Sequence, residues 1–304
     1  MSGEQRIRYL DDPELYCDAN YVRTYGASGI NYWSELCGKL VREAELKPEH
    51  VVADLGCGTG YATKEIVSTG VLAVYAIDPS KEMLAGCGGN LANTTIIQGT
   101  IDDLIKSNLK KPDVIISSGV FAVMCNPADV LKKIYSYLDK TGRYVFTLED
   151  WSGENVGGES LSSFFAKVRQ YEQVLGLEQP DLRFIGRNKY FSEEVGKMVV
   201  GAGGEITKCY SREMSSSAEN EFGYAFEMSC VNSKIKQFEA QLQNERKLGV
   251  HDRLRIVKEL REQERIRKLF EEFKSLYERK RWVVGTQHVF HTAKRVMTET
   301  QSLV

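Results

Sequence analysis

The ten residues VVADLGCGTG, at positions 51–60, constrain the fold more than any other part of the chain. The short apolar run that ends in Asp54 predicts a buried strand. Three glycines follow it, and glycine permits the positive φ angles and close backbone approach that a ligand at such a turn requires. Because a helix is predicted directly after the turn, its unpaired N–H groups point to the same place. The segment therefore predicts a strand, a ligand-binding turn and a helix.

A second acidic residue ends the next predicted strand. In YAIDPS, Asp78 lies where a carboxylate can accept hydrogen bonds from both hydroxyls of a ribose. The glycine spacing places Tyr61 where a dinucleotide fingerprint has its third glycine, which argues against a nicotinamide or flavin cofactor. The alternative is that Asp78 only begins a turn with Pro79, and the intact glycine turn upstream disfavours it.

Apolar runs alternate with helical stretches from residue 51 to residue 150. Continuous apolar strands separated by helices are typical of βαβ units and a parallel sheet. We expect Ser80, Asn126 and Ser192 to cap helices. The predicted strands are 51–55, 71–78, 94–98, 113–118, 142–150, 205–214 and 286–295, and the predicted helices begin at residues 61, 81, 101, 127 and 193.

Two flanking segments are predicted to be helical. Apolar residues three and four apart indicate an amphipathic helix over 30–44, in a stretch rich in tyrosine. Residues 233–281 carry 15 basic and 9 acidic side chains and predict a helical hairpin, with Gly249 ending its first helix and Asp252 capping its second. The hairpin has three interpretations: a cover over a substrate pocket, a homodimer surface, or a contact for RNA or an acidic protein. The interleaved acidic residues favour the first.

Taken together, these motifs make the chain resemble the class I S-adenosylmethionine-dependent methyltransferases. DLGCGTG is similar to the first motif of that family, AIDPS to the second, IIQGTIDDL to the third, and residues 112–146 to the fourth to sixth. The resemblance implies S-adenosyl-L-methionine as cofactor and methyl transfer as the reaction. It implies a Rossmann-like α/β fold with a seven-stranded, mostly parallel sheet and helices on both faces, an N-terminal helical cap and an inserted helical hairpin.

The resemblance also implies a division of the chain and roles for its residues. The division is a cap over 1–49, a cofactor-binding core over 50–213, a helical substrate cover over 214–281, and a closing strand and tail over 282–304. The turn would hold the methionine part of the cofactor, Asp54 would orient the turn or the amino group, and Asp78 would hold the ribose. The residues implied for the cofactor are Asp54, Gly56, Cys57, Gly58, Gly60, Asp78, Pro79, Met83, Thr100, Ile101, Ser117 and Tyr25.

One position departs from the family pattern. Many relatives have Gly-Asp-Ala after the third strand, whereas this chain has Gly99, Thr100 and Ile101. The Thr100 hydroxyl or a backbone carbonyl would then accept from the adenine amino group in place of the aspartate.

The acceptor side of the site is less sharply defined by the sequence. Glu149 and Asp150 end the fifth predicted strand, where open α/β sheets bind ligands, so we expect one of them to contact the substrate. The alternative is that these two carboxylates only form part of a turn and do not contact the substrate. Because relatives often close the cofactor cleft with an N-terminal helix, Tyr21 or Tyr25 is a candidate for a lid over the cofactor. No metal site is predicted, because His288 and His291 are three apart in a strand and face opposite sides.

Composition narrows the function classes. The formal net charge is −2, which does not favour a nucleic-acid binder, and no apolar run is long enough to span a membrane. Seven scattered cysteines without a Cys-x-x-Cys pair predict reduced thiols and a cytoplasmic location. We expect a small-molecule substrate. A protein or RNA methyltransferase and a non-catalytic cofactor-binding scaffold remain as alternatives.

Overall fold

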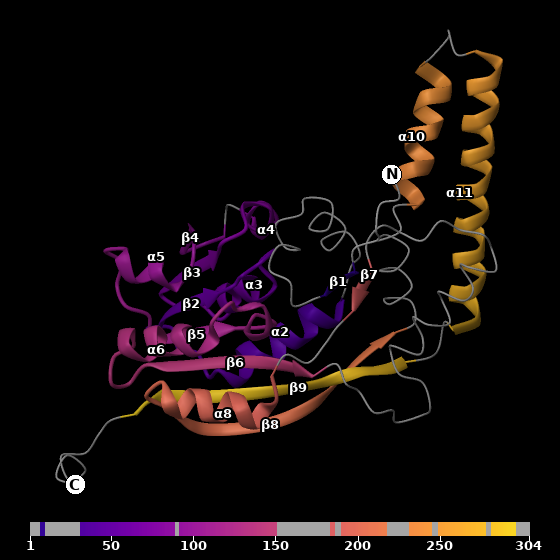
Figure 1. Cartoon of the computed structure of the whole chain (residues 1–304). Helices are drawn as coiled ribbons and strands as arrows, with labels where there is room; N and C mark the ends of the chain where they lie inside the picture. Colours follow the sequence, from indigo (N-terminus) through magenta and orange to yellow (C-terminus); the bar gives the residue numbers. More distant parts are fainter. Residues whose placement is uncertain are drawn as a thin grey trace, which may run out of the picture.

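The computed structural model describes residues 7–9, 31–88, 91–150, 183–185, 190–217, 231–244, 249–277 and 281–295. Its centre is a seven-stranded sheet with the strand order β4-β3-β2-β5-β6-β9-β8 (Figure 1). Strand β9 pairs antiparallel with both β6 and β8, and the other pairs in this sheet are parallel. This confirms the predicted mostly parallel sheet. The strands are β2 (Val51–Leu55), β3 (Ala73–Asp78), β4 (Thr94–Gln98), β5 (Val114–Ser117), β6 (Arg143–Asp150), β8 (Gly204–Ser217) and β9 (Arg281–Lys294).

Helices cover both faces of the sheet, because alternate strand residues point to opposite sides. In β2, Val52 belongs to a core cluster with residues of α2 and α3, while Val51 and Ala53 belong to another with residues of α5, α6 and α8. Leu84 and Cys87 of α4 pack with Ala76 of β3, on the α2 side. The helices are α2 (Asn31–Glu43), α3 (Tyr61–Ser68), α4 (Lys81–Cys87), α5 (Ile101–Lys106), α6 (Pro127–Tyr137) and α8 (Ser192–Gly201), with a 3₁₀ turn at Phe121–Val123.

Local capping chemistry fixes several helix starts. The Ser80 hydroxyl accepts from the Met83 N–H at 3.0 Å, and the Asn126 side chain accepts from the Asp129 N–H at 3.3 Å, as predicted. The prediction that Ser192 caps α8 was wrong. The cap position is Phe191, whose N–H donates to the Glu194 carboxylate at 3.0 Å, so Ser192 is the first residue of the helix.

The predicted hairpin is present as α10 (Val231–Asn244) and α11 (Val250–Tyr277), inserted between β8 and β9. Figure 1 shows the two helices side by side, standing beyond the ends of β8 and β9. Asp252 does not cap α11 but lies in its first turn, and Gly249 directly precedes this helix. Strand β8 continues past the expected boundary at residue 213 to Ser217, which pairs with Arg281.

One pairing near the beginning of the chain was not predicted. Strands β1 (Ile7–Tyr9) and β7 (Arg183–Ile185) form a separate parallel pair. The helix predicted over 30–44 is confirmed as α2, whose buried residues include Leu40 and Val41. No helix in the described part of the chain is both long and apolar enough to cross a membrane.

Candidate functional site

The glycine turn lies between β2 and α3, at the carboxyl ends of the parallel strands. Gly56, Gly58 and Gly60 have φ angles of 75°, 54° and 87°, in the left-handed region that favours glycine. The N–H groups of Gly56 and Cys57 donate to the carbonyl of Ile77 at 2.7 and 3.0 Å, so the turn folds against the end of β3. The sequence motif therefore places its glycines where the backbone requires them.

Gly58 leaves more room on the turn than Gly56 does. A Cβ atom at this position would have the Met83 sulfur as its nearest neighbour, at 3.9 Å, whereas one at Gly56 would clash with Val120 at 2.4 Å. The turn is therefore tightly packed at Gly56 and less crowded at Gly58. Met83 itself is buried beside Gly58, and Pro79 is exposed.

Asp78 organises the turn at the tip of β3. Its two carboxylate oxygens accept from the N–H groups of Gly58 and Ser80, each at 2.9 Å. The side chain is largely buried, and burial raises the pKa of Asp78 while these two hydrogen bonds lower it. A carboxylate offers about four lone-pair sites, so Asp78 retains acceptor capacity for ligand hydroxyls.

Asp54 lies beneath the turn, on the α2 and α3 side of the sheet. The Thr63 hydroxyl donates to its carboxylate at 2.5 Å. Burial raises the pKa of Asp54 to about 7, and the nearby Cys87 and Asp78 add to this effect. Asp54 therefore changes protonation near neutral pH, in direct contact with the helix that follows the turn.

Cys57 packs inside the turn rather than facing outward. It is buried, together with Cys87 and Ala76, and its thiol contacts the Gly58 carbonyl at 3.8 Å. Its side chain therefore fills space inside the turn. No group of three or more His, Cys, Asp or Glu side chains able to hold a metal ion occurs among the described residues.

Three other predicted cofactor residues have side chains occupied by protein contacts. Thr100 caps α5, accepting from the Asp102 N–H at 3.2 Å, and Ile101 is buried in the core. Ser117 is fully buried and shares a hydrogen bond of 2.7 Å with the Tyr144 hydroxyl. Within the described chain, any ligand contact of Ile101 or Ser117 would therefore go through the backbone. Tyr21 and Tyr25 lie outside the described residues.

The two predicted acceptor residues point to opposite faces because they are adjacent in β6. Glu149 lies on the α2 face, buried to 4% exposure, and accepts from the Gln287 side chain at 2.9 Å. Burial raises the pKa of Glu149, while hydrogen bonds from Gln287 and Thr147 lower it. Asp150 is half-buried at the strand end.

The helix α2 was predicted, but its contact with the segment after β5 was not. Trp33 lies against the backbone just after β5, where a Cβ atom at Gly119 would come within 3.0 Å of the indole ring. Gly119 has a φ of 68°, so glycine is favoured there on both grounds. Cys37, one turn further along α2, contacts the Ser118 hydroxyl at 3.6 Å. The segment after β5 thus lies directly under α2.

Comparisons with known proteins agree with this geometry. A family model described as a methyltransferase domain matches residues 46–273. A malonyl-[acyl-carrier protein] O-methyltransferase of Halalkalibacterium halodurans is 30% identical over 139 residues, which cover 44% of this chain and 50% of that protein. The chain thus spans half the length of the curated relative that it matches.

Solved structures of similar overall arrangement are more distant. A structure from Bacillus halodurans described as that of a putative methyltransferase has a TM-score of 0.47 and 14% identity, covering 86% of this chain and 99% of that one. A methyltransferase of Geobacter sulfurreducens in complex with S-adenosyl-L-homocysteine has a TM-score of 0.43 and 15% identity, covering 86% and 90%.

Proposed function

Because this chain belongs to the methyltransferase-domain family, within the class I S-adenosylmethionine-dependent methyltransferases, we propose that it methylates a small-molecule acceptor at oxygen, nitrogen or carbon. When bound, S-adenosylmethionine supplies a methyl group that its sulfonium sulfur has already activated. The protein's contribution is then mainly to hold the acceptor and the cofactor in reacting geometry.

We assign the cofactor contacts to the turn and its two aspartates. Asp78, already fixed by the Gly58 and Ser80 N–H groups, would accept from ribose hydroxyls. The less crowded side of the turn, at Gly58, would receive the methionine part, and Met83 would line the adenine side. Asp54 would act in its ionised form on the turn or on the amino group of the cofactor. These roles are the same as those that the sequence motifs predict.

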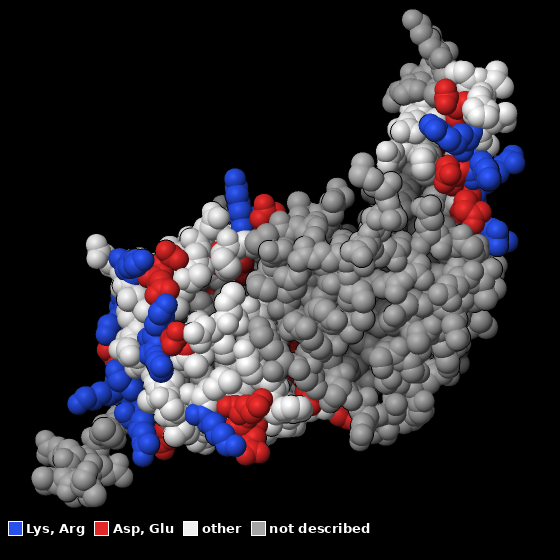
Figure 2. Space-filling model, in the orientation of Figure 1, with Lys and Arg blue, Asp and Glu red and all other residues white. Residues whose placement is uncertain are grey.

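The observation that supports a small acceptor is the wall formed by α2. Trp33 packs against Gly119 at the strand edge where the cofactor's reactive end is expected, so an indole ring would bound the space for the acceptor and favour a small molecule. On the face shown in Figure 2, the basic side chains lie among acidic ones, over the sheet region and over the hairpin alike. A mixed surface of this kind does not favour nucleic acid as the substrate. Glu149 and Asp150 stay predictions as acceptor contacts.

Methyl-labelled S-adenosylmethionine tests this proposal directly. Incubation with cell extract, separated into small-molecule, protein and RNA fractions, is expected to label the small-molecule fraction. The Asp78→Ala variant, which should lose the cofactor, serves as the matched control. Label in RNA would overturn the proposal. Cofactor binding without label in any fraction would favour a non-catalytic scaffold.

A second candidate acceptor comes from the curated relative. Because that protein is named for O-methylation of a malonyl group on an acyl-carrier protein, a carboxylate presented on a carrier protein is the alternative acceptor for this chain. In the labelling experiment, this alternative predicts label in the protein fraction that alkaline hydrolysis releases as methanol.

From the pKa of Asp54 we predict that cofactor binding depends on pH. Since burial raises this pKa to about 7, the carboxyl is mostly protonated at pH 6 and ionised at pH 8. If the ionised form is required, affinity for S-adenosylhomocysteine should rise as the pH increases, by nearly tenfold per pH unit below about pH 7, and then level off. Calorimetric titration between pH 5.5 and 8.5 would measure this.

Two variants control the pH experiment. Asp54→Asn should bind weakly with a flat pH profile. Thr63→Val removes the hydroxyl that donates to Asp54, so the rise in affinity should move to higher pH.

The stability of the free protein should change with pH in the opposite direction to cofactor affinity. A raised carboxyl pKa stabilises the free protein at low pH, and this contribution is lost as the pH rises through about 7. Binding that strengthens toward low pH would contradict the assigned role.

A further inference from the structure

A row of polar side chains crosses three strands on the α2 face of the sheet. Arg212 of β8 is paired in register with Gln287 of β9, and Gln287 with Glu149 of β6. The Arg212 Nε donates to Gln287 Oε1 at 2.8 Å, and Gln287 Nε2 donates to Glu149 Oε1 at 2.9 Å. The amide of Gln287 is fully buried, and its orientation is fixed because each end meets a charged partner.

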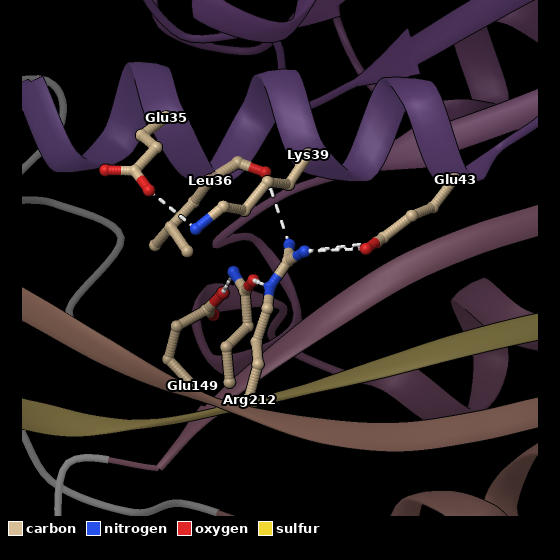
Figure 3. A network of polar contacts seen from close by, with 7 residues as sticks. Glu35, Leu36, Lys39, Glu43, Glu149 and Arg212 are labelled. Carbon is tan, nitrogen blue, oxygen red and sulfur yellow. Dashed lines mark hydrogen bonds and ion pairs between the residues drawn. The ribbon is translucent and has the colours of Figure 1, made fainter.

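The same guanidinium holds helix α2 (Figure 3). Its Nη1 donates to both carboxylate oxygens of Glu43, each at 3.1 Å, and its Nη2 donates to the Leu36 carbonyl at 3.3 Å. The Arg212 side chain is 14% exposed, so these contacts are largely shielded from water. A planar guanidinium can serve three directions at once, which an ammonium group cannot do with the same geometry.

At its other end the row reaches the backbone under Trp33. The Thr147 side chain hydrogen-bonds the Glu149 carboxylate, and its hydroxyl oxygen accepts from the Gly119 N–H at 3.0 Å. Trp33 of α2 packs against this same Gly119. The next residue, Val120, is packed against Gly56 of the glycine turn. Arg212 is thus connected to one point, Gly119, through α2 on one side and through the sheet on the other.

From this arrangement we propose that Arg212 is a positioning residue for methyl transfer, which fixes α2 so that Trp33 forms the wall of the site over Gly119. Glu149 acts together with Arg212, because its carboxylate fixes the orientation of the Gln287 and Thr147 side chains. The proposal rests on the proposed function, because it assigns the reacting end of the cofactor to this edge. A partly buried ion pair is weak evidence for stability alone, since desolvation offsets much of the attraction.

The test compares Arg212→Met with a matched variant on the same helix. Lys39→Met also removes a cation from an ion pair of α2, the exposed pair with Glu35 at 2.6 Å, in which Arg212 takes no part. Each variant is made in a background where Trp33 is the only tryptophan, with Trp151 and Trp282 replaced by phenylalanine. The readouts are Trp33 fluorescence, S-adenosylhomocysteine affinity by calorimetry, and the thermal midpoint of unfolding.

We expect Arg212→Met to shift Trp33 emission to the red and to weaken S-adenosylhomocysteine binding about tenfold, because only part of the population keeps α2 in place. Arg212→Lys should restore little, and Lys39→Met should change neither readout. A lower thermal midpoint with unchanged emission and affinity would show that Arg212 only stabilises the fold, and would overturn the proposal.

Two further results separate this proposal from the function on which it rests. If the parent protein does not bind S-adenosylhomocysteine at all, the proposed function fails. If the parent binds and the Arg212 variants bind equally well with unchanged Trp33 emission, only the positioning role fails. Should Arg212→Met not fold, Glu43→Gln provides the same comparison, with smaller shifts expected in the same direction.

Discussion

Replacing Asp78 with alanine is expected to weaken S-adenosylhomocysteine binding by about 100-fold or more. The substitution removes the proposed ribose acceptor and also releases the Gly58 and Ser80 N–H groups, which the carboxylate holds at 2.9 Å. A hydrogen bond to a charged group contributes about 1.5–3 kcal/mol, and about 1.4 kcal/mol corresponds to a tenfold change in affinity. Losing the proposed hydrogen bonds from the two ribose hydroxyls gives the expected effect, which isothermal calorimetry would measure.

Two variants make the Asp78 result specific. Asp139→Ala removes an exposed carboxylate that pairs with Lys111 and should leave cofactor affinity unchanged. Asp78→Asn keeps one side-chain oxygen but loses the charge, so its affinity should lie between those of the parent and Asp78→Ala. Parent-like affinity in Asp78→Ala, in a folded protein, would show that the cofactor site has been assigned to the wrong strand end.

The second large effect is expected at Gly56. Gly56 and Gly70 both have a φ of 75°, so alanine meets the same backbone strain at either position. At Gly56 the new Cβ would also lie 2.4 Å from Val120 Cγ2, whereas at Gly70 it would meet nothing within 4 Å. Overpacking of this kind costs about 1–3 kcal/mol. Urea unfolding should therefore show Gly56→Ala to be less stable than Gly70→Ala by about that amount, and Gly56→Ala should also bind the cofactor more weakly.

A second-site change checks the cause of the Gly56 effect. Val120→Ala removes both methyl groups that the new Cβ would meet. Added to Gly56→Ala, it should recover part of the lost stability and binding, although alone it should be mildly destabilising. Equal losses in Gly56→Ala and Gly70→Ala would mean that backbone strain alone limits the turn.

The parts of the fold that the sequence predicted well depend on short-range chemistry. Ser80 and Asn126 were identified as helix caps because a cap acts on an N–H group three residues away. The glycine turn and Asp78 are joined by one strand–turn–helix–strand unit, so their spacing alone placed them together. Ser192 was misassigned because the Glu194 side chain caps the Phe191 N–H, which moves the start of the helix.

The part of the site that could not be predicted depends on contacts between distant residues. Arg212, Gln287 and Glu149 meet only because β9 lies between β8 and β6 in one particular register, and a single sequence does not reveal that register. Neither Trp33 nor Gly119 belongs to a sequence pattern that would mark it as part of the site. The resemblance implies Ser117 as a cofactor residue, and its sequence position does not reveal that its hydroxyl is hydrogen-bonded to Tyr144 in the core.

The position of β9 has a consequence for how the chain reaches its final form during synthesis. Among the described strands β9 is the last to leave the ribosome, yet it occupies a place inside the sheet, and its Gln287 bonds to Glu149 across a separation of 138 residues. Until it arrives, β6 has an open edge and β8 lacks its partner in this sheet. The turn and Asp78 can therefore assemble early, whereas Arg212 acquires its partner in β9 late, because contacts this distant form slowly. The nascent chain should gain affinity for the cofactor before it gains the wall that Trp33 forms over the site.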